Sequence, residues 1–315
     1  MATVLVLIDQ PGEALHKSHR ELLTIAARLG GAAVAFLGDL NDEISQELGA
    51  RGVETIYRPA SPDVAEFLVA GKAAFLTATV RASSPSAVLL GNSSEAKEIA
   101  ARAGVQLTSG VITDAVAIGA DLTVTKSVLA GSYAVEAKVT TGTPLITVKA
   151  NIVEVAPAGD GGAPEMVTVD SVIPARAARI TGRTAKAASG RPELTEARVI
   201  VAGGRGVDGD FTPVEELADA LGGAVGASRA ATDAGWIEHS AQIGQTGKTV
   251  SPQLYISAGI SGAIQQKAGM QTAKVIIAVN KDADSPVFEI ADFGVVGDLF
   301  TVLPQATAEI IKRRS

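Results

Sequence analysis

The feature that most constrains this chain is the alternation of short apolar runs with longer amphipathic stretches over its first hundred residues. Residues 3–8, 32–37 and 87–90 are apolar apart from Thr3, as in strands that are buried on both faces. The stretches between them have helical periodicity, and Asn41 is placed to cap a helix that Gly49 would end. This part of the chain therefore predicts an α/β fold.

From residue 105 to about residue 173 the pattern changes to short β-branched runs separated by Gly, Asp and Ser. Residues 122–125, 134–137 and 145–148 are examples, and we expect mainly antiparallel strands there. Residues 183–193 are small, polar or helix-breaking and have no apolar periodicity, which is typical of an interdomain linker. We predict two domains, 1–190 and 191–315, the first an α/β domain with extra β-strands.

The second domain begins with a strand at residues 197–202, a Gly-rich turn and a helix that starts at Thr212. Thr212 and Glu215 have capping-box spacing, and Pro213 stands in the tolerated first turn. We expect further strands at residues 254–257, 274–279 and 287–290. Each ends in a cluster of Gly, Ser, Asn or Asp, and in a parallel sheet such strand ends share one rim, where ligands bind. The second domain is thus expected to be a Rossmann-like or flavodoxin-like parallel sheet.

Composition removes several functional classes. The chain has no cysteine, so redox chemistry would need a bound organic cofactor rather than thiols or iron–sulfur clusters. A net charge of −7 with 3% aromatic residues argues against nucleic-acid binding. With no 18-residue apolar run and no basic flank before the first strand, we expect neither a membrane span nor a signal peptide, and a cytoplasmic location.

Two segments resemble phosphate-binding motifs, but each lacks part of the pattern or of its expected context. Residues 204–209 match G-x-G-x-x-G after a strand, which leaves a nicotinamide-dependent oxidoreductase as an alternative, although no acidic residue is well placed for a ribose. Residues 244–249 resemble a nucleotide-triphosphate loop, but Gln242 replaces its first Gly and a strand follows instead of a helix. We expect no ATP hydrolysis.

The order of motifs in the second domain resembles that of electron-transfer flavoprotein alpha subunits of the bacterial type. The signature is residues 254–265, Leu-Tyr-Ile-Ser-Ala-Gly-Ile-Ser-Gly-Ala-Ile-Gln, followed by Gly269 and by Ile-Ala-Val-Asn at residues 277–280. Flanking segments of the family also have counterparts here, at residues 225–231, 242–248, 281–282 and 291–299. The resemblance spans the second domain and is looser in the first.

The resemblance implies an FAD site in the C-terminal domain. The positions that correspond to family FAD contacts are Arg205, Ser228, Arg229, Gln242, Ile243, Gly244, Gln245, Thr246, Ser261, Gly262, Ala263, Ile264, Gln265, Gln266, Asn280, Asp298 and Leu299. Arg229 is expected against the flavin ring, where a permanent cation favours reduced flavin. Thr246 is expected at the reactive edge of the ring, and Asp298 at the adenine or ribose end or as a helix cap.

The resemblance also implies an electron carrier without a substrate of its own. It would form a heterodimer with a beta subunit that holds AMP, and the heterodimer would carry one FAD. It would accept electrons from acyl-CoA and related dehydrogenases of fatty acid beta-oxidation and would pass them to a membrane quinone oxidoreductase. No catalytic acid–base pair and no metal site are expected in this chain. An electron-bifurcating relative with a second flavin, and a structural subunit without flavin, remain open.

One position departs from the family pattern. Gln266 follows Gln265 where the family commonly has His, which is thought to face a carbonyl of the flavin's pyrimidine ring. A glutamine can donate a hydrogen bond but is neutral at every pH, and charge-assisted hydrogen bonds are roughly twice as strong as neutral ones. We therefore expect a less stabilised anionic semiquinone than in His-bearing relatives.

Overall fold

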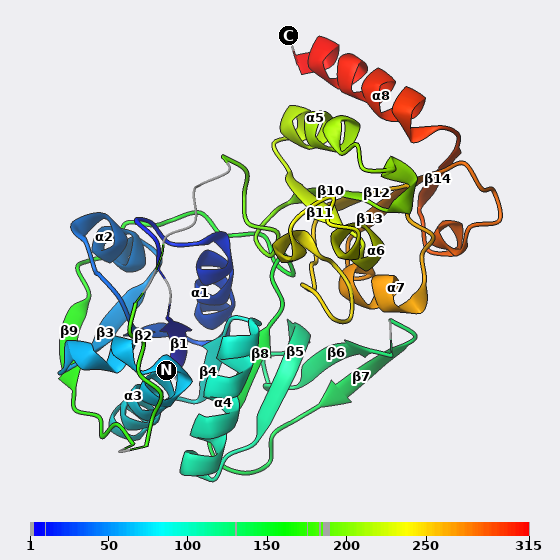
Figure 1. Ribbon diagram of the computed structural model, residues 1–315. Coiled ribbons are helices and arrows are strands. Elements are labelled where there is room, and N and C mark those ends of the chain that lie inside the picture. Colours follow the sequence, from blue (N-terminus) through cyan, green and yellow to red (C-terminus); the bar gives the residue numbers. More distant parts are fainter. Residues whose placement is uncertain are drawn as a thin grey trace. The chain divides into compact units, whose positions relative to one another are not determined.

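The computed structural model describes residues 3–9, 11–129, 131–174, 176–182, 184 and 190–314. The chain divides into two compact units, each with its own β-sheet (Figure 1). The first unit covers Met1–Lys126 and Ala134–Ala185, and the second covers Ser127–Tyr133 and Lys186–Ser315. The protein is thus a two-unit α/β protein, as its sequence pattern predicts.

The first sheet has nine strands in the order β7-β6-β5-β8-β4-β1-β2-β3-β9. The strands are β1 (Val4–Ile8), β2 (Ala32–Phe36), β3 (Val53–Pro59), β4 (Ala87–Leu90), β5 (Val111–Ile118), β6 (Val124–Val128), β7 (Tyr133–Ala137), β8 (Leu145–Val148) and β9 (Glu165–Val169). The helices of this unit are α1 (Lys17–Leu29), α2 (Asp42–Ala50), α3 (Leu68–Ser83) and α4 (Ser94–Leu107), with a 3₁₀ turn η1 (Pro62–Glu66).

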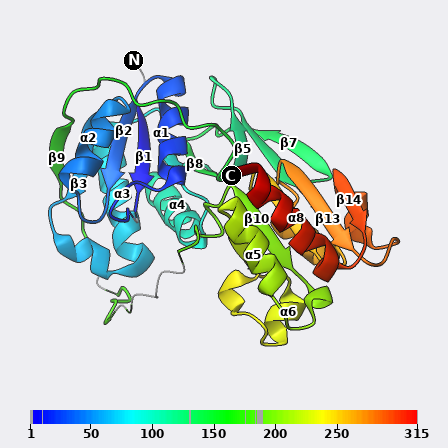
Figure 2. The same cartoon turned by 90° about the horizontal axis from the view of Figure 1, so that it is seen from above.

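Helices cover both faces of this sheet, because its central strands are apolar on both sides (Figure 2). In β1, Val4, Val6 and Ile8 pack in the core formed with α1 and α2. Leu5 and Leu7 point to the opposite core, formed with α3 and α4. All five residues of β1 are at most 2% exposed, which is the pattern of a strand between two helical layers.

The expectation of mainly antiparallel strands after residue 105 is wrong. β5 and β6 are antiparallel, but β8 runs parallel to both β4 and β5, and β9 runs parallel to β3. The reason is that β8 inserts between two strands that precede it in the chain. Short runs separated by Gly and Asp are compatible with either direction, because direction depends on the path of the connection.

Of the two predicted ends of α2, the structure confirms the start and not the end. Asn41 caps α2 as predicted, because its side-chain oxygen accepts a hydrogen bond from the Ile44 N–H at 2.7 Å. Gly49 does not end the helix, which continues through Ala50. It serves close packing instead, since a Cβ at Gly49 would lie 2.2 Å from the carbonyl oxygen of Gly162.

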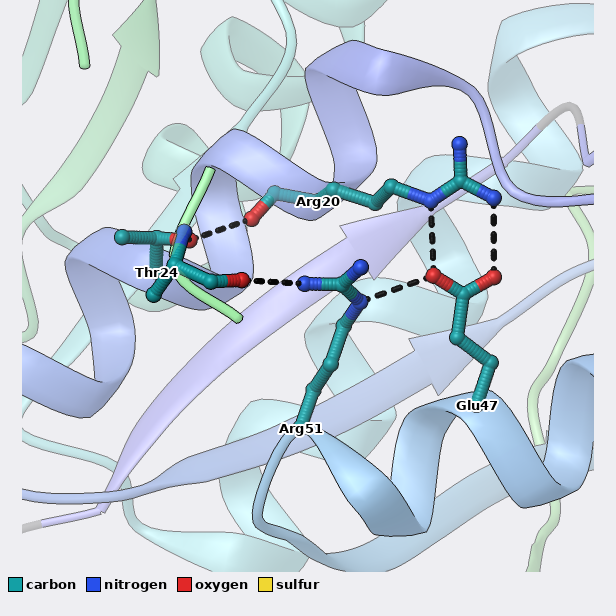
Figure 3. Close-up of polar contacts among 5 residues, drawn as sticks. Arg20, Thr24, Glu47 and Arg51 are labelled. Atoms are coloured by element: carbon teal, nitrogen blue, oxygen red, sulfur yellow. Dashed lines mark hydrogen bonds and ion pairs between the residues drawn. The ribbon is translucent and has the colours of Figure 1, made fainter. Parts of the chain in front are cut away.

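A polar network ties α1, α2 and the segment that follows β8 (Figure 3). Glu47 accepts two hydrogen bonds from Arg20, at 2.6 and 2.9 Å, and one from Arg51 at 2.8 Å. Arg51 also donates to the carbonyl of Ala156, whose own N–H donates to the hydroxyl of Thr24. One carboxylate thus holds two cations that bridge three segments of chain.

The second unit is built on a five-stranded sheet in the order β11-β10-β12-β13-β14, and every neighbouring pair is parallel. Its strands are β10 (Val199–Gly203), β11 (Ala224–Ala227), β12 (Leu254–Ala258), β13 (Val275–Asn280) and β14 (Phe293–Val296). The helices are α5 (Thr212–Leu221), α6 (Arg229–Asp233), α7 (Ile264–Met270) and α8 (Leu299–Arg314), with 3₁₀ turns η2 (Arg205–Val207), η3 (His239–Ala241) and η4 (Pro286–Glu289). This is the flavodoxin-like strand order, whose switch point lies between β10 and β12.

Two local predictions in this unit need correction. Residues 287–290 were expected to form a strand, but Pro286–Glu289 is a 3₁₀ turn and the fifth strand is Phe293–Val296. Pro286 stands in the first turn, where its missing N–H is harmless, and the Val287 N–H bonds the carbonyl of Ser261 rather than a neighbouring strand. Thr212 is the first residue of α5 rather than its cap, and Asp210 accepts the Thr212 N–H at 2.9 Å.

Among the helices of the described residues, none is long and apolar enough to cross a membrane.

Candidate functional site

The carboxyl ends of all five strands of the second sheet open onto one cavity of about 1200 Å³. This placement follows from the topology, because parallel strands put the loops after them on the same edge of the sheet. The walls come from the segments that follow β10, β11, β12, β13 and β14 and from residues 242–246. The cavity is a concave site at the topological switch point, where open α/β sheets bind ligands.

Glycines allow two of these loops to approach each other at the switch point. The Gly206 N–H donates to the carbonyl of Gly259 at 3.0 Å, and the Gly204 N–H donates to that of Ala258 at 2.9 Å. A Cβ on Gly206 would lie 2.7 Å from the Cα of Gly259, so no side chain fits at that contact. The glycines of the G-x-G pattern thus bring backbone against backbone across β10 and β12.

The segment of residues 242–248 forms a second wall, which is supported by α7. The Gln245 N–H donates to the carbonyl of Gln265 at 2.8 Å, and the Lys248 N–H donates to that of Gln242 at 2.8 Å. Gly269 of α7 lies directly against Gly244, because a Cβ at Gly269 would be 2.3 Å from the Gly244 nitrogen. α7 therefore fixes the path of this wall.

Gln242 holds Thr246 at the cavity. Its side chain is 8% exposed and lies between two hydroxyls. Its Nε2 donates to the Thr246 Oγ1 at 2.9 Å, and its Oε1 accepts from the Thr232 Oγ1 at 3.3 Å. A buried amide lowers stability unless both its oxygen and its nitrogen are hydrogen-bonded. The two hydrogen bonds of Gln242 therefore fix the orientation of Thr246, which is itself exposed to the cavity.

Arg229 supplies a cation on the first turn of α6. Ser228 caps this helix by accepting the Ala231 N–H, and Arg229 follows it directly. The side chain of Arg229 is 67% exposed, and its Nε lies 3.2 Å from the Oδ2 of Asp233. Arg205, in the turn after the neighbouring strand β10, also lines the cavity and has no carboxylate partner among the described residues.

Asn280 connects the loops after β12 and β13. Its Nδ2 donates to the carbonyl of Ile260 at 3.0 Å and to the Ser285 Oγ at 3.1 Å, while its Oδ1 accepts the Asp282 N–H at 3.1 Å. Both amide hydrogens are thereby engaged within the protein. In this structure Asn280 shapes the wall, and the part that remains for a ligand is its carbonyl oxygen.

Asp298 caps α8 at the edge of the cavity, as one of its two expected roles predicts. It lines the cavity, and its Oδ1 accepts the Phe300 N–H at 3.0 Å in the first turn of α8. Leu299 beside it is 5% exposed and packs in the core under the cavity.

The entry to α7 offers backbone donors rather than a side-chain cap. Within the described chain, the N–H groups of Ala263, Ile264 and Gln265 have no acceptor, as expected at a helix start. Gly262 makes the turn before them with a φ of 81°, and a Cβ there would lie 2.4 Å from the Val287 nitrogen. Gln266, one turn further, donates from its Nε2 to the Tyr255 hydroxyl at 2.8 Å.

The structure brings nearly all predicted positions to one cavity. Those that line it are Arg205, Ser228, Arg229, Gln242, Ile243, Gly244, Gln245, Thr246, Ser261, Ala263, Gln265, Gln266, Asn280, Asp298 and Leu299. Gly262 and Ile264 do not line it: Gly262 is buried in its turn, and the side chain of Ile264 is 71% exposed elsewhere.

Further lining residues were not among the predicted FAD contacts, although several stand in the family segments, namely Gly206, Asp208, Ala230, Asp233, Gly259, Ile260, Lys281, Asp282, Ser285, Gly297 and Phe300. Most of them neighbour a predicted residue in the chain. Asp233 carried a usable signal, because it stands four residues after Arg229 on a helix, the spacing of an ion pair. Ser285 carried none, since only the fold brings it to Asn280.

The donors and shapes around the cavity fit FAD. Its diphosphate is an anion, and free backbone N–H groups at a helix start together with arginine side chains are the groups that bind such anions in proteins. Its ring system presents carbonyl and imino groups, which Thr246, Gln265 and Gln266 can bond from the walls.

Comparisons with known proteins agree with this assignment. Residues 4–173 match the electron transfer flavoprotein domain, and residues 193–271 match the electron transfer flavoprotein FAD-binding domain. The chain is 47% identical to the electron transfer flavoprotein subunit alpha of Mycobacterium leprae, over 100% of both chains. It is 48% identical to that of Mycobacterium tuberculosis, over 100% of this chain and 99% of the relative, and 36% identical to that of Bacillus subtilis, over 87% and 85%. These relatives are named for electron transfer rather than for a reaction on a substrate, and the chain belongs to the family of electron transfer flavoprotein alpha subunits.

Proposed function

We propose that the strand-end cavity of the second unit holds FAD and that the chain works as an electron carrier. The observation that carries this proposal is the convergence, on one cavity, of the predicted residues from the ends of all five parallel strands. The bound flavin would supply the electron-accepting and electron-donating chemistry, because no cysteine is present. The chain's own residues bind and orient the cofactor.

The residues divide this work by their chemistry. Arg205 and the N–H groups at the start of α7 would bind the diphosphate, and Asp298 would accept from the ribose or adenine. Arg229 would place its positive charge beside the flavin ring and so favour the reduced state. Thr246, which Gln242 orients, would hydrogen-bond the ring edge.

The partners follow from the family and are part of the proposal. We propose a heterodimer with a beta subunit, with one FAD per heterodimer and with AMP in the beta subunit. Electrons would arrive from acyl-CoA and related dehydrogenases of fatty acid oxidation and leave to a membrane quinone oxidoreductase. The name "subunit alpha" of the relatives supports a second subunit.

The nicotinamide alternative has less structural support. After Gly204 the chain makes a 3₁₀ turn, Arg205–Val207, and the next helix starts only at Thr212. A dinucleotide fingerprint instead opens a helix within its glycines, so that the helix start faces the pyrophosphate. Gly204 and Gly206 are accounted for by their close contact with Gly259 and Ile260.

The test is electron transfer by the alpha–beta complex. Purified complex mixed with an acyl-CoA dehydrogenase and its substrate should lose the absorbance of oxidised flavin, and should regain it when an electron acceptor is added. Reduction by a nicotinamide alone, without any dehydrogenase, would instead support the oxidoreductase alternative. Two flavins per heterodimer would support a bifurcating relative.

A further inference from the structure

Tyr255, which is not part of the cavity wall, carries a hydroxyl whose hydrogen bond within the described residues is to Gln266. Tyr255 lies in β12 and is fully buried, in a core that contains Ile243, Met270 and Ile276. The Nε2 of Gln266 lies 2.8 Å from its hydroxyl oxygen. The side chain of Gln266 comes from α7 and is half-buried, between this core and the cavity.

The hydroxyl is conspicuous because the surroundings of Tyr255 are apolar. A phenol buried among Ile and Met side chains costs stability unless it is bonded, and a phenylalanine would occupy the same space without that cost. Burial raises the pKa of Tyr255 above its usual value, so the phenol stays protonated and can both donate and accept. The polar atom that it meets belongs to a residue of the cavity wall.

An amide bonded at one end has a defined group at the other. When the Nε2 of Gln266 bonds Tyr255, the Oε1 is left for other partners; when the amide is turned over, the Tyr255 hydroxyl donates to the Oε1 and the NH₂ group is left. Without the phenol, this restriction on the amide is lost. The phenol therefore restricts the hydrogen-bonding group that the wall presents at position 266.

We propose that Tyr255 is a positioning residue that acts through Gln266 and sets the hydrogen bond between this amide and FAD. The inference rests on the proposed function, because Gln266 lines the cavity assigned to FAD. Gln266 would then make the hydrogen bond to FAD, and Tyr255 would fix the orientation of its amide. The competing explanation is that Tyr255 only fills the core.

A double-mutant cycle separates these explanations. The full chain is purified in complex with its beta subunit as wild type, Tyr255→Phe, Gln266→Met and the double variant, and FAD affinity, flavin midpoint potential and thermal unfolding are measured for each. Methionine has nearly the size of glutamine but no hydrogen-bonding amide. Tyr57→Phe, which removes a half-buried phenol from the first unit, is the control for loss of a hydroxyl.

The expected result is coupling between the two positions. Tyr255→Phe should weaken FAD binding roughly two- to tenfold, the effect of one net hydrogen bond, and should shift the midpoint potential. In the Gln266→Met background the same change should alter neither quantity, because the amide through which Tyr255 acts is gone. The double variant should also unfold at a higher temperature than Gln266→Met, since it removes the unpaired phenol.

Equal effects of Tyr255→Phe in both backgrounds, or no effect in either, would overturn the proposal. Should Tyr255→Phe fail to fold by itself, the double variant is compared directly with Gln266→Met. Equal FAD affinity and midpoint potential in these two, both different from those of the wild type, support the proposal, and a difference between the two variants overturns it. If wild type binds FAD and the cycle shows no coupling, only this inference fails. If wild type binds no FAD, the proposed function fails as well.

Discussion

We propose that Arg229, which lines the cavity, exerts the most direct electrostatic effect on a flavin bound there. It stands at the start of α6, and its Nε lies 3.2 Å from the Oδ2 of Asp233, four residues later. Arg229→Gln should lower the flavin midpoint potential and weaken FAD binding by about tenfold, because a charge-assisted contact is lost. Potentiometric titration of the complex checks the first effect, and equilibrium dialysis checks the second.

A matched control exists in the first unit. Arg102 also forms an exposed ion pair with a carboxylate four residues away, Glu98, on a helix. Arg102→Gln should leave potential and affinity unchanged. If the two variants behave alike, Arg229 does not act on the flavin.

At the residue scale, sequence could predict the wall of the cavity well but not the way its residues support one another. Arg205, Arg229 and Thr246 stand in segments whose order is characteristic of the family. The contact of Asn280 with Ser285 and that of Gln266 with Tyr255 join different strands and helices. Only the fold decides such contacts, so no local pattern could have revealed them.

At the scale of the element, α7 and the segment of residues 242–248 form one wall because two glycines meet. Gly269→Ala would place a Cβ 2.3 Å from the Gly244 nitrogen, which backbone cannot accommodate without moving. We expect a loss of about 1–3 kcal/mol in the free energy of unfolding of the second unit, the usual cost of overpacking, together with weaker FAD binding. Chemical denaturation and FAD titration measure the two effects.

The control for this substitution is Gly91→Ala. A Cβ at Gly91 meets no atom within 4 Å, and its backbone is not in the left-handed region. It should change stability by only a few tenths of a kcal/mol. Normal FAD binding by Gly269→Ala would show that the wall tolerates displacement and that α7 does not fix it.

The network around Glu47 gives a pH-dependent contribution to the first unit. Hydrogen bonds from Arg20 first, and then from Arg51, hold the pKa of Glu47 below its usual value of 4.5. Its stabilisation is therefore fully present above pH 4.5 and is lost as the pH falls through the folded-state pKa. At pH 7, Glu47→Gln should cost about 1 kcal/mol, a modest value because the carboxylate is partly exposed.

Denaturant titrations at neutral and acidic pH test whether the contribution of Glu47 to stability depends on pH. The difference between wild type and Glu47→Gln should shrink as the pH falls below 4.5. Glu98→Gln, in the exposed pair with Arg102, should show almost no difference at either pH. A pH-independent loss in Glu47→Gln would mean that packing rather than charge accounts for its effect.

The sequence predicted strands correctly where both faces of the strand are buried and turn residues follow its end. β1, β2 and β4 lie within one residue of the predicted runs, because helical layers on both faces demand continuous apolar sequence. The direction of β8 and the strand Phe293–Val296 were missed for different reasons. β8 owes its direction to insertion between β4 and β5. β14 is a four-residue edge strand, and its run Phe-Gly-Val-Val was passed over for the similar run of residues 287–290 just before it.

At the scale of the whole molecule, each of the two units has a sheet of its own, and the strand-end cavity belongs to the second unit. The residues assigned to FAD all belong to that unit, so cofactor binding is expected to depend on the second unit. The first unit matches the electron transfer flavoprotein domain over residues 4–173, which agrees with a role in the same complex.

The most direct test of this account is the flavin content of the complex purified with its beta subunit, compared with a variant whose cavity is filled. Wild type should carry one FAD per heterodimer with the absorbance of oxidised flavin. Ala263→Trp, which places a large side chain on the cavity wall, should lose it, while Val105→Trp, at a position 82% exposed in the first unit, should retain it. A colourless wild-type complex, or full FAD occupancy in Ala263→Trp, would contradict the assignment of this cavity to the flavin.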